Sequence, residues 1–355
     1  MPNLAIHRLP MAHPGDLSAL AALIDRGEVR AAEIRAVIGK TEGNGGLNDF
    51  TRGYFTQSLM LLLSRATGED LAALAGRIPC VLSGGTEGAL SPHYLVFAVD
   101  RAAAGPRGLA LGTAFSAPTP AADIGREAQI ELVARAVRDA MADAGITRAE
   151  DVVLVQVKAP CAQAPGPEAR SGDPRLLMAL SRAAAAFGVG RALGDIPDGT
   201  EDDLLRDLLK YSNRASISSG IEVTANEVLV FGHADGWAPG LTAGVAPMAD
   251  LLDLDGVVAA FHAAGLPAAP AVPVAQRARV LGVLAKGEPE KSGAIRGARH
   301  TMLGDTDLDA QRHLRGALGA IVASVAGQGQ VFVSGGAEHQ GPPGGGLVCV
   351  FARAV

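Results

Sequence analysis

A pattern that occurs three times along this chain constrains its fold more than any other feature. An apolar, strand-like run ends at a lysine, and a later apolar run ends at a serine followed by glycine. The lysines are Lys40, Lys158 and Lys286, and the serines lie 43, 60 and 48 residues further on, at Ser83, Ser218 and Ser334. The first and third serine motifs read SGGTE and SGGAE, whereas the second reads SSGIE. Internal similarity of this kind predicts three copies of one structural unit.

Each copy also carries an arginine between its lysine and its serine. The three arginines, Arg52, Arg182 and Arg315, lie in segments of helical periodicity at residues 48–68, 173–190 and 305–327. A further strand-like run follows each serine motif. Amphipathic helices are also expected before the lysine strands, most clearly at residues 16–27 and 123–146. The predicted unit is therefore helix, strand with lysine, helix with arginine, strand with serine, and strand.

The repeats define the expected domain organisation. We place them at residues 1–104, 108–248 and 254–355, with turn-rich or linker-like segments between them. Strands that alternate with helices predict an α/β fold. By analogy with other triplicated units, we expect the three copies to surround a pseudo-threefold axis with their equivalent residues facing it.

Composition excludes several classes of function. The formal net charge of -6 over 355 residues argues against a nucleic-acid partner, which requires a basic face. Cys80, Cys161 and Cys349 form no CxxC pair, so reduced thiols of a cytoplasmic protein are expected. The N-terminus does not resemble a signal peptide, and we expect no membrane-spanning segment. The eight histidines lack metal-ligand spacing, which disfavours a zinc hydrolase.

The repeated residue types indicate a chemistry if they converge. Three lysines, three arginines and three serines would form a site for a small ligand with three carbonyl groups in threefold arrangement, because arginine donates forked hydrogen bonds to such oxygens. Serine beside a neutral lysine is a nucleophile and its general base. Glycine after the serine allows backbone N–H groups to approach an oxyanion. We therefore expect acyl transfer at an amide, with no cofactor in the chemistry.

Several motifs give this chain a resemblance to a known family. The segments are GKTEGNGGLNDFTR (39–52), SGGTEGALSPH (83–93), QVK (156–158), RGARHTML (296–303) and SGGAEHQGPPGGG (334–346). With these, the sequence resembles the cyanuric acid hydrolase/barbiturase family of ring-opening amidohydrolases over essentially its whole length. The resemblance implies three similar repeats around a central β-barrel with helices outside. It also implies a Ser-Lys dyad that opens cyanuric acid to carboxybiuret, which then yields biuret and CO2, and a homotetramer.

The resemblance implies specific site residues. The catalytic pair corresponds to Lys158 and Ser218. The implied substrate contacts are Arg52, Ser83, Gly84, Arg182, Ser218, Ser219, Arg315, Ser334 and Gly335.

The residues themselves leave alternatives open. Arg191 competes with Arg182, and Arg312 competes with Arg315, while the roles of Lys40 and Lys286 stay open. Barbiturase, which opens barbiturate to ureidomalonate, is the rival activity, and a non-catalytic small-molecule binding protein is the rival of another class.

A charge argument also selects the second lysine. Glu42 and Glu288 each lie two residues after a lysine and would keep it protonated, whereas Lys158 has no adjacent acid. On this reasoning Lys158 is the lysine expected to be neutral.

The tail of the third serine motif predicts a metal site. Its prolines and glycines form a loop with carbonyl oxygens that a hard cation can bind together with a carboxylate. The resemblance places a structural divalent ion here, Mg²⁺ by preference over Ca²⁺, with Glu288, Ala337, Gln340, Gly341, Pro342 and Gly345 as ligands. The alternative is a rigid turn that binds only water.

Overall fold

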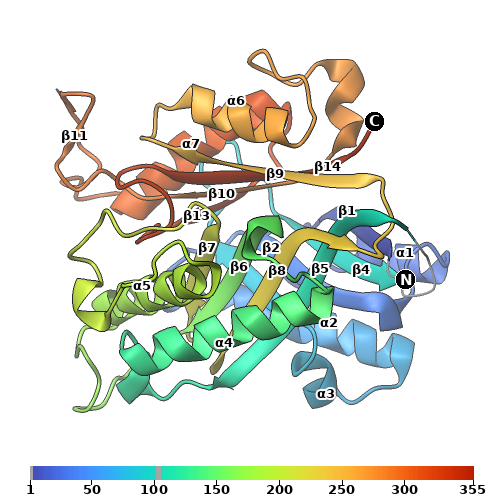
Figure 1. The fold of residues 1–355 in the computed structure, drawn as a ribbon, viewed down its shortest axis with the longest axis horizontal. Helices are drawn as coiled ribbons and strands as arrows, with labels where there is room; N and C mark the ends of the chain where they lie inside the picture. The colour runs from blue at the N-terminus through green and yellow to red at the C-terminus, as the bar shows by residue number, and fades with distance from the viewer. Residues whose placement is uncertain (1–2, 101–104) are drawn as a thin grey trace.

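Three sheets in the middle of the molecule, with helices outside them, make up the fold (Figure 1). The structure is a computed structural model that describes residues 3–100 and 105–355. The first predicted repeat boundary, at residue 104, lies outside the described residues. Within them, the four-stranded sheets have the orders β1-β4-β2-β3, β5-β8-β6-β7 and β9-β14-β10-β13.

The three sheets share one topology. In each, the lysine strand pairs in parallel with the serine strand and antiparallel with the strand that follows the serine motif. The first sheet contains β1 (Asn3–Pro10), β2 (Ile34–Thr41), β3 (Cys80–Gly84) and β4 (His93–Asp100). The second contains β5 (Arg107–Pro118), β6 (Val152–Pro160), β7 (Ala215–Gly220) and β8 (Ala225–Asp235). The third contains β9 (Leu241–Met248), β10 (Val280–Gly287), β13 (Phe332–Gly335) and β14 (Gly346–Arg353). A small hairpin, β11 (Ala294–Ile295) and β12 (Ala298–Arg299), is separate from them.

One strand of each sheet was absent from the predicted unit. β1, β5 and β9 each open their repeat and pair antiparallel with its last strand. β9 lies within the residues predicted to end the second repeat, at 108–248, yet it pairs with β14 of the third sheet. The third sheet therefore begins at Leu241 rather than after residue 254, because strand pairing determines which repeat a segment joins.

The inner faces of the sheets meet in one hydrophobic core. Phe97, Phe231 and Phe351 occupy equivalent places on β4, β8 and β14, and their ring centroids lie 4.8–5.7 Å apart. Each sheet also shifts register once between the lysine strand and the last strand, next to these rings. Equivalent residues thus face a common axis, which confirms the α/β class and the three-repeat architecture. The sheets stay three separate hydrogen-bonded sheets in the described part of the chain, around the centre where a barrel was expected.

Helices cover the outer face of each sheet (Figure 1). They are α1 (Ser18–Asp25), α2 (Thr51–Thr67) and α3 (Leu71–Ala75) in the first repeat, α4 (Glu127–Ala144) and α5 (Pro174–Leu193) in the second, and α6 (Leu254–Ala263) and α7 (Ala310–Ala326) in the third. Short 3₁₀ helices occur at Ala31–Glu33, Ala121–Asp123, Ala149–Asp151, Glu201–Asp203 and Val274–Arg279. The observed helices confirm all five predicted helical segments.

Helix α5 is the one described helix that is long and apolar enough to cross a membrane by composition. Most of it is buried inside this molecule, against α4 and the strands β6 and β7. Asp173 caps its first turn by accepting a hydrogen bond from the Arg175 N–H, and Pro174 occupies the first helical position. Its apolar character is therefore that of a core helix.

Candidate active site

The lysine and the serine of each repeat lie directly across from each other on parallel strands. The register pairs Lys40 with Ser83, Lys158 with Ser218 and Lys286 with Ser334. All six side chains are buried, with exposed fractions of 8% or less. Cross-strand neighbours on parallel strands point to the same face of a sheet, so each pair faces the inside of the molecule. The lysine and serine are therefore register partners in all three repeats, although their separation along the chain differs.

The arginines connect the repeats into a ring. Each arginine forms an ion pair with the glutamate of the next repeat's serine motif, in cyclic order: Arg52 with Glu222 at 2.8 Å, Arg182 with Glu338 at 2.6 Å and Arg315 with Glu87 at 2.5 Å. The last two pairs have two hydrogen bonds each. The sequence pattern contained these glutamates, but their role required the spatial order of the repeats.

The arginines and serines surround one cavity. Its lining consists of Gly45, Arg52, Leu82, Ser83, Met178, Arg182, Ser218, Ser219, Arg315, Ser334 and Gly335. All the implied substrate contacts except Gly84 are in this set. Sequence reasoning missed Gly45, Leu82 and Met178, which carry no repeated chemical signal.

Gly84 has a packing role beside the cavity. Its backbone oxygen accepts a hydrogen bond from Lys40 Nζ at 3.0 Å. A Cβ atom at this position would lie 1.6 Å from Asp49 Oδ2, so only glycine fits. Asp49 in turn accepts a hydrogen bond from the Gly45 N–H at 2.8 Å, which positions one wall of the cavity.

The competing arginines lie elsewhere. Arg191 forms ion pairs with Glu127 and Glu131 at the partly exposed end of α5. Arg312, one turn before Arg315 on α7, is partly exposed and does not line the cavity. Arg182 and Arg315 are the ones that the fold brings to the serines.

Lys40 and Lys286 have similar environments. Lys286 Nζ lies 2.9 Å from Ser334 Oγ, and Lys40 Nζ lies 3.3 Å from Ser83 Oγ. Burial lowers the pKa of both amines well below its ordinary value, and Arg315 and Arg182 respectively lower it further. Burial and a neighbouring arginine thus act in the same direction on both amines.

Lys158 has a different environment. Its Nζ donates to the Leu82 carbonyl at 3.0 Å and lies 2.6 Å from Glu222 Oε1. Burial lowers the pKa of Lys158 to about 8, a smaller shift because Glu222 favours the charged amine. The argument that Lys158 alone has no acid beside it is wrong, because strand pairing brings in an acid that adjacency along the chain does not reveal.

The hydroxyl of Ser218 is oriented towards the third repeat. Its Oγ lies 3.1 Å from Ser334 Oγ. Among the described hydrogen bonds, none joins Lys158 Nζ to Ser218 Oγ, although the two residues are register partners.

The predicted metal loop brings its residues together at the end of the third sheet. The Glu288 N–H donates to the Gly345 carbonyl at 3.2 Å, and the Gln340 N–H donates to the Ala337 carbonyl at 2.9 Å. The Glu288 side chain is buried, and its closest cation is Lys291 at 3.8 Å. Burial and the nearby Glu338 raise the pKa of Glu288 to about 7. A buried carboxylate beside the backbone carbonyls of this loop is a donor set that fits a hard cation. The Gln340 side-chain oxygen is used otherwise, as acceptor for the Ile217 N–H.

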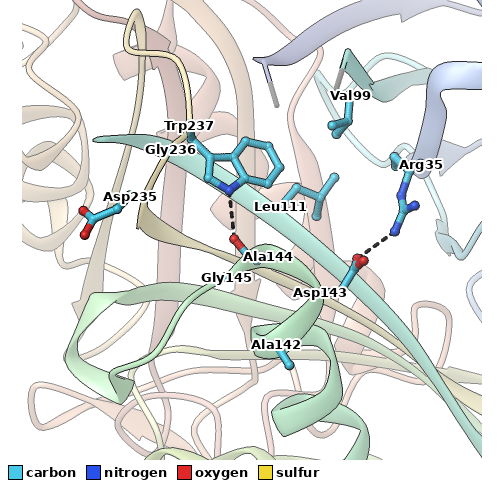
Figure 2. A pocket seen from close by; sticks show the side chains of 10 residues that line it. All are labelled: Arg35, Val99, Leu111, Ala142, Asp143, Ala144, Gly145, Asp235, Gly236 and Trp237. Carbon is cyan, nitrogen blue, oxygen red and sulfur yellow. Dashed lines mark hydrogen bonds and ion pairs between the residues drawn. The ribbon is translucent and has the colours of Figure 1, made fainter. Parts of the chain in front are cut away.

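Another cavity lies between the first and second repeats, away from these residues (Figure 2). It is lined by Arg35, which pairs with Asp143 at 2.6 Å, and by Trp237, whose ring N–H donates to the Ala144 carbonyl at 2.8 Å. None of the sequence-predicted site residues is in its lining, and its walls carry no repeated motif.

Comparisons with known proteins agree with this geometry. The model of the amidohydrolase ring-opening family matches residues 5–353. A cyanuric acid amidohydrolase of Ectopseudomonas oleovorans is 44% identical over 98% of this chain and 99% of its own length. One from Azorhizobium caulinodans is also 44% identical, over 99% of both chains.

Solved structures are similar over the whole chain. A cyanuric acid hydrolase described as an evolutionary innovation by structural concatenation has a TM-score of 0.93 at 40% identity, and covers 100% of both chains. A cyanuric acid hydrolase from A. caulinodans has a TM-score of 0.92 at 42% identity, again over 100% of both chains.

Proposed function

This chain belongs to the amidohydrolase ring-opening family and is a cyclic amide hydrolase, and we propose that its substrate is cyanuric acid. One observation carries the choice of substrate. Three equivalent arginine–serine sets line a single cavity with pseudo-threefold symmetry. A planar ring with three equivalent carbonyl groups can present one oxygen to each set, and arginine N–H groups are the donors suited to such oxygens. Two relatives that share nearly the whole chain length are cyanuric acid amidohydrolases, which supports the same substrate.

We propose Ser218 as the nucleophile and Lys158 as its general base. The two are register partners, and Ser218 lies on the cavity wall. A general base works best when its pKa is near the working pH, because the same group must first accept and then return a proton. The pKa of Lys158, about 8, satisfies this condition. Burial lowers the pKa of Lys40 and Lys286 well below the ordinary value, and each amine already hydrogen-bonds the serine of its own repeat, so we assign both to substrate binding.

The proposed reaction conserves every proton within the site. Neutral Lys158 takes the Ser218 hydroxyl proton as the oxygen attacks one ring carbonyl carbon. The tetrahedral intermediate breaks its ring C–N bond, and Lys158 returns the proton to the leaving nitrogen. Water, activated by the same amine, then cleaves the bond between the acyl carbon and Ser218 Oγ. This regenerates the serine and releases carboxybiuret, which loses CO2 to give biuret.

A structural divalent cation is part of the proposal. Glu288 and the carbonyl oxygens of Ala337, Gly341, Pro342 and Gly345 would hold Mg²⁺, or Ca²⁺, with Gln340 a ligand only if its amide leaves Ile217. Its charge would compensate the buried Glu288 carboxylate. The ion would stabilise the loop after Ser334 and take no part in bond cleavage. We also propose the cytoplasmic homotetramer that the family resemblance implied, which sedimentation velocity would test.

Substrate preference is tested by incubating the purified protein with cyanuric acid and with barbiturate and following the loss of ring absorbance. Turnover of cyanuric acid is expected. Turnover of barbiturate alone would assign the protein as a barbiturase. Tight binding of cyanuric acid without product would favour a binding protein.

A further inference from the structure

Each of the three repeated lysines has a register partner on the antiparallel strand, and this partner differs among the repeats. The register pairs Lys40 with His93, Lys158 with Glu227 and Lys286 with Leu347. Of these three described positions, only that of the second repeat holds an acid. Directly opposite residues of an antiparallel pair point to the same face of the sheet, so the Glu227 side chain lies on the side of Lys158.

Glu227 and Lys158 reach the same free edge of a neighbouring strand. β3 is the last strand of the first sheet, so one of its edges is unpaired. Along this edge the Cys80 N–H donates to Glu227 Oε2 at 2.7 Å, and the Leu82 carbonyl accepts from Lys158 Nζ at 3.0 Å. Cys80 and Leu82 are two residues apart and present their backbone groups to the same side. The edge of β3 therefore holds the carboxyl and the amine on one side, at positions two residues apart.

A second cavity lies behind this pair. It has a volume of about 400 Å³ and is lined by residues of α2 and α3 together with Cys80, Glu222, Val223 and Glu227. Neither glutamate lines the cavity that contains Ser218. Glu222 connects the two sides, because its carboxylate contacts both Lys158 and Arg52. Glu222, which contacts Lys158, and Glu227, its register partner, therefore both line a cavity that is separate from the proposed substrate site.

Burial favours the neutral form of the Glu227 side chain. Burial raises the pKa of Glu227 to about 8; the Cys80 N–H and Lys158 oppose this shift, and Glu222 adds to it. The Cys80 thiol beside it is buried with a raised pKa, so it carries no charge at pH 7. Burial lowers the pKa of Lys158 to about 8, against the effects of Glu222 and Glu227, while Arg52 lowers it further. Two groups with matched affinities exchange a proton at little cost in free energy, and they titrate as a coupled pair.

We propose that Glu227 is a positioning residue that takes a proton from the Lys158 ammonium and exchanges it with water in the second cavity. The balance is one proton: ammonium and carboxylate become amine and carboxylic acid. This leaves Lys158 neutral for Ser218 without a proton crossing the substrate site. The inference rests on the proposed role of Lys158 as the base. It also explains why one repeat of three carries the chemistry, since His93 and Leu347 cannot do the same: burial lowers the pKa of His93 to about 4, and leucine has no proton to exchange.

Replacing Glu227 by glutamine separates this role from a structural one. Glutamine keeps an oxygen for the Cys80 N–H but cannot accept the proton. In Glu227→Gln, the acid limb of the kcat/KM profile should move to lower pH, because a negative charge that favoured the Lys158 ammonium is lost. The kcat at the optimum should fall about tenfold with KM unchanged, since loss of assisted proton transfer affects the chemical step. Glu227→Asp should restore the limb of the parent protein in part.

The matched control is the equivalent position of the first repeat. His93→Gln should leave the acid limb where it is, whatever it does to stability. A Glu227→Gln profile that coincides with the parent profile would overturn the proposal, because an acceptor for Cys80 is then all that Glu227 provides.

A readout independent of turnover tests the pair directly. In protein labelled with ¹³C at glutamate carboxyl carbons, one signal that titrates near pH 8 should be present and absent in Glu227→Gln. In Lys158→Ala the same signal should titrate at higher pH, because its cationic partner is gone. An unchanged titration in Lys158→Ala would also overturn the proposal, whether or not the protein opens cyanuric acid. Failure to open cyanuric acid, with the titrations as expected, would instead refute the proposed function and leave the proton pair established.

Discussion

The second repeat and its two companions have the same backbone geometry and different electrostatics. In all three, lysine and serine are register partners, and an arginine from one repeat pairs with a glutamate of the next. Lys40 and Lys286 hydrogen-bond their own serines, and no acid lies across the strand from them. Lys158 contacts Glu222 and faces Glu227 instead. The difference teaches that triplication places equivalent arginines and serines around one cavity, while the acids near Lys158 leave its pKa at about 8, less lowered than that of the other two lysines.

The largest expected effect is a difference in turnover between substitutions in the second repeat and the same substitutions in the other two. Ser218→Ala and Lys158→Ala should each reduce kcat by roughly 10⁴-fold or more, because removal of a nucleophile or its base eliminates covalent catalysis. Ser83→Ala and Ser334→Ala should retain far more turnover and mainly raise KM. Steady-state kinetics on cyanuric acid measures both. An inactive Ser83→Ala protein beside an active Ser218→Ala protein would move the chemistry to the first repeat.

How far the sequence could predict this site follows from where its signals lie. Strand-end lysines and serine-glycine motifs are local patterns, and the lysine–serine pairs and arginines that they singled out lie in one region of the structure. The charge argument for Lys158 failed because Glu222 and Glu227 reach it through strand pairing, which adjacency cannot report. The opening strands β1, β5 and β9 were also missed. β9, for example, reads LTAGVAPM, with glycine and proline that weaken a strand signal, and its pairing with β14 supplies what local propensity does not.

A smaller effect sharpens a comparison between two arginines of helix α5, of which Arg182 pairs with a buried glutamate and Arg191 with two half-exposed ones. Arg182→Ala leaves the carboxylate of Glu338, whose side chain is 7% exposed, without its bidentate partner. Breaking such a buried pair costs about 3–5 kcal/mol of folding free energy. Arg191→Ala, on the same helix, removes two partly exposed ion pairs, each worth at most about 1 kcal/mol.

Urea unfolding of both variants measures the difference. The double variant Arg182→Met with Glu338→Gln should regain much of the stability but not the affinity for cyanuric acid, because the ring then lacks one set of donors. Equal destabilisation by Arg182→Ala and Arg191→Ala would contradict the assignment of Arg182 to the ring of ion pairs.

The smallest effect concerns the loop of the third repeat that follows Ser334 and is rich in proline and glycine. If a divalent ion binds Glu288 and the loop carbonyls, chelation should lower Tm by about 4 °C, as expected for a ligand present at about a hundred times its Kd. Because the pKa of Glu288 is about 7, protonation competes with the ion, so the chelator effect should shrink as pH falls below 7.

Glu288→Gln should melt at the lower temperature with or without chelator. Glu42→Gln, its counterpart two residues after Lys40, should keep the full response. Elemental analysis of the purified protein would identify the ion. A chelated protein that keeps its Tm yet loses turnover would contradict a structural role and place the ion in the chemistry instead.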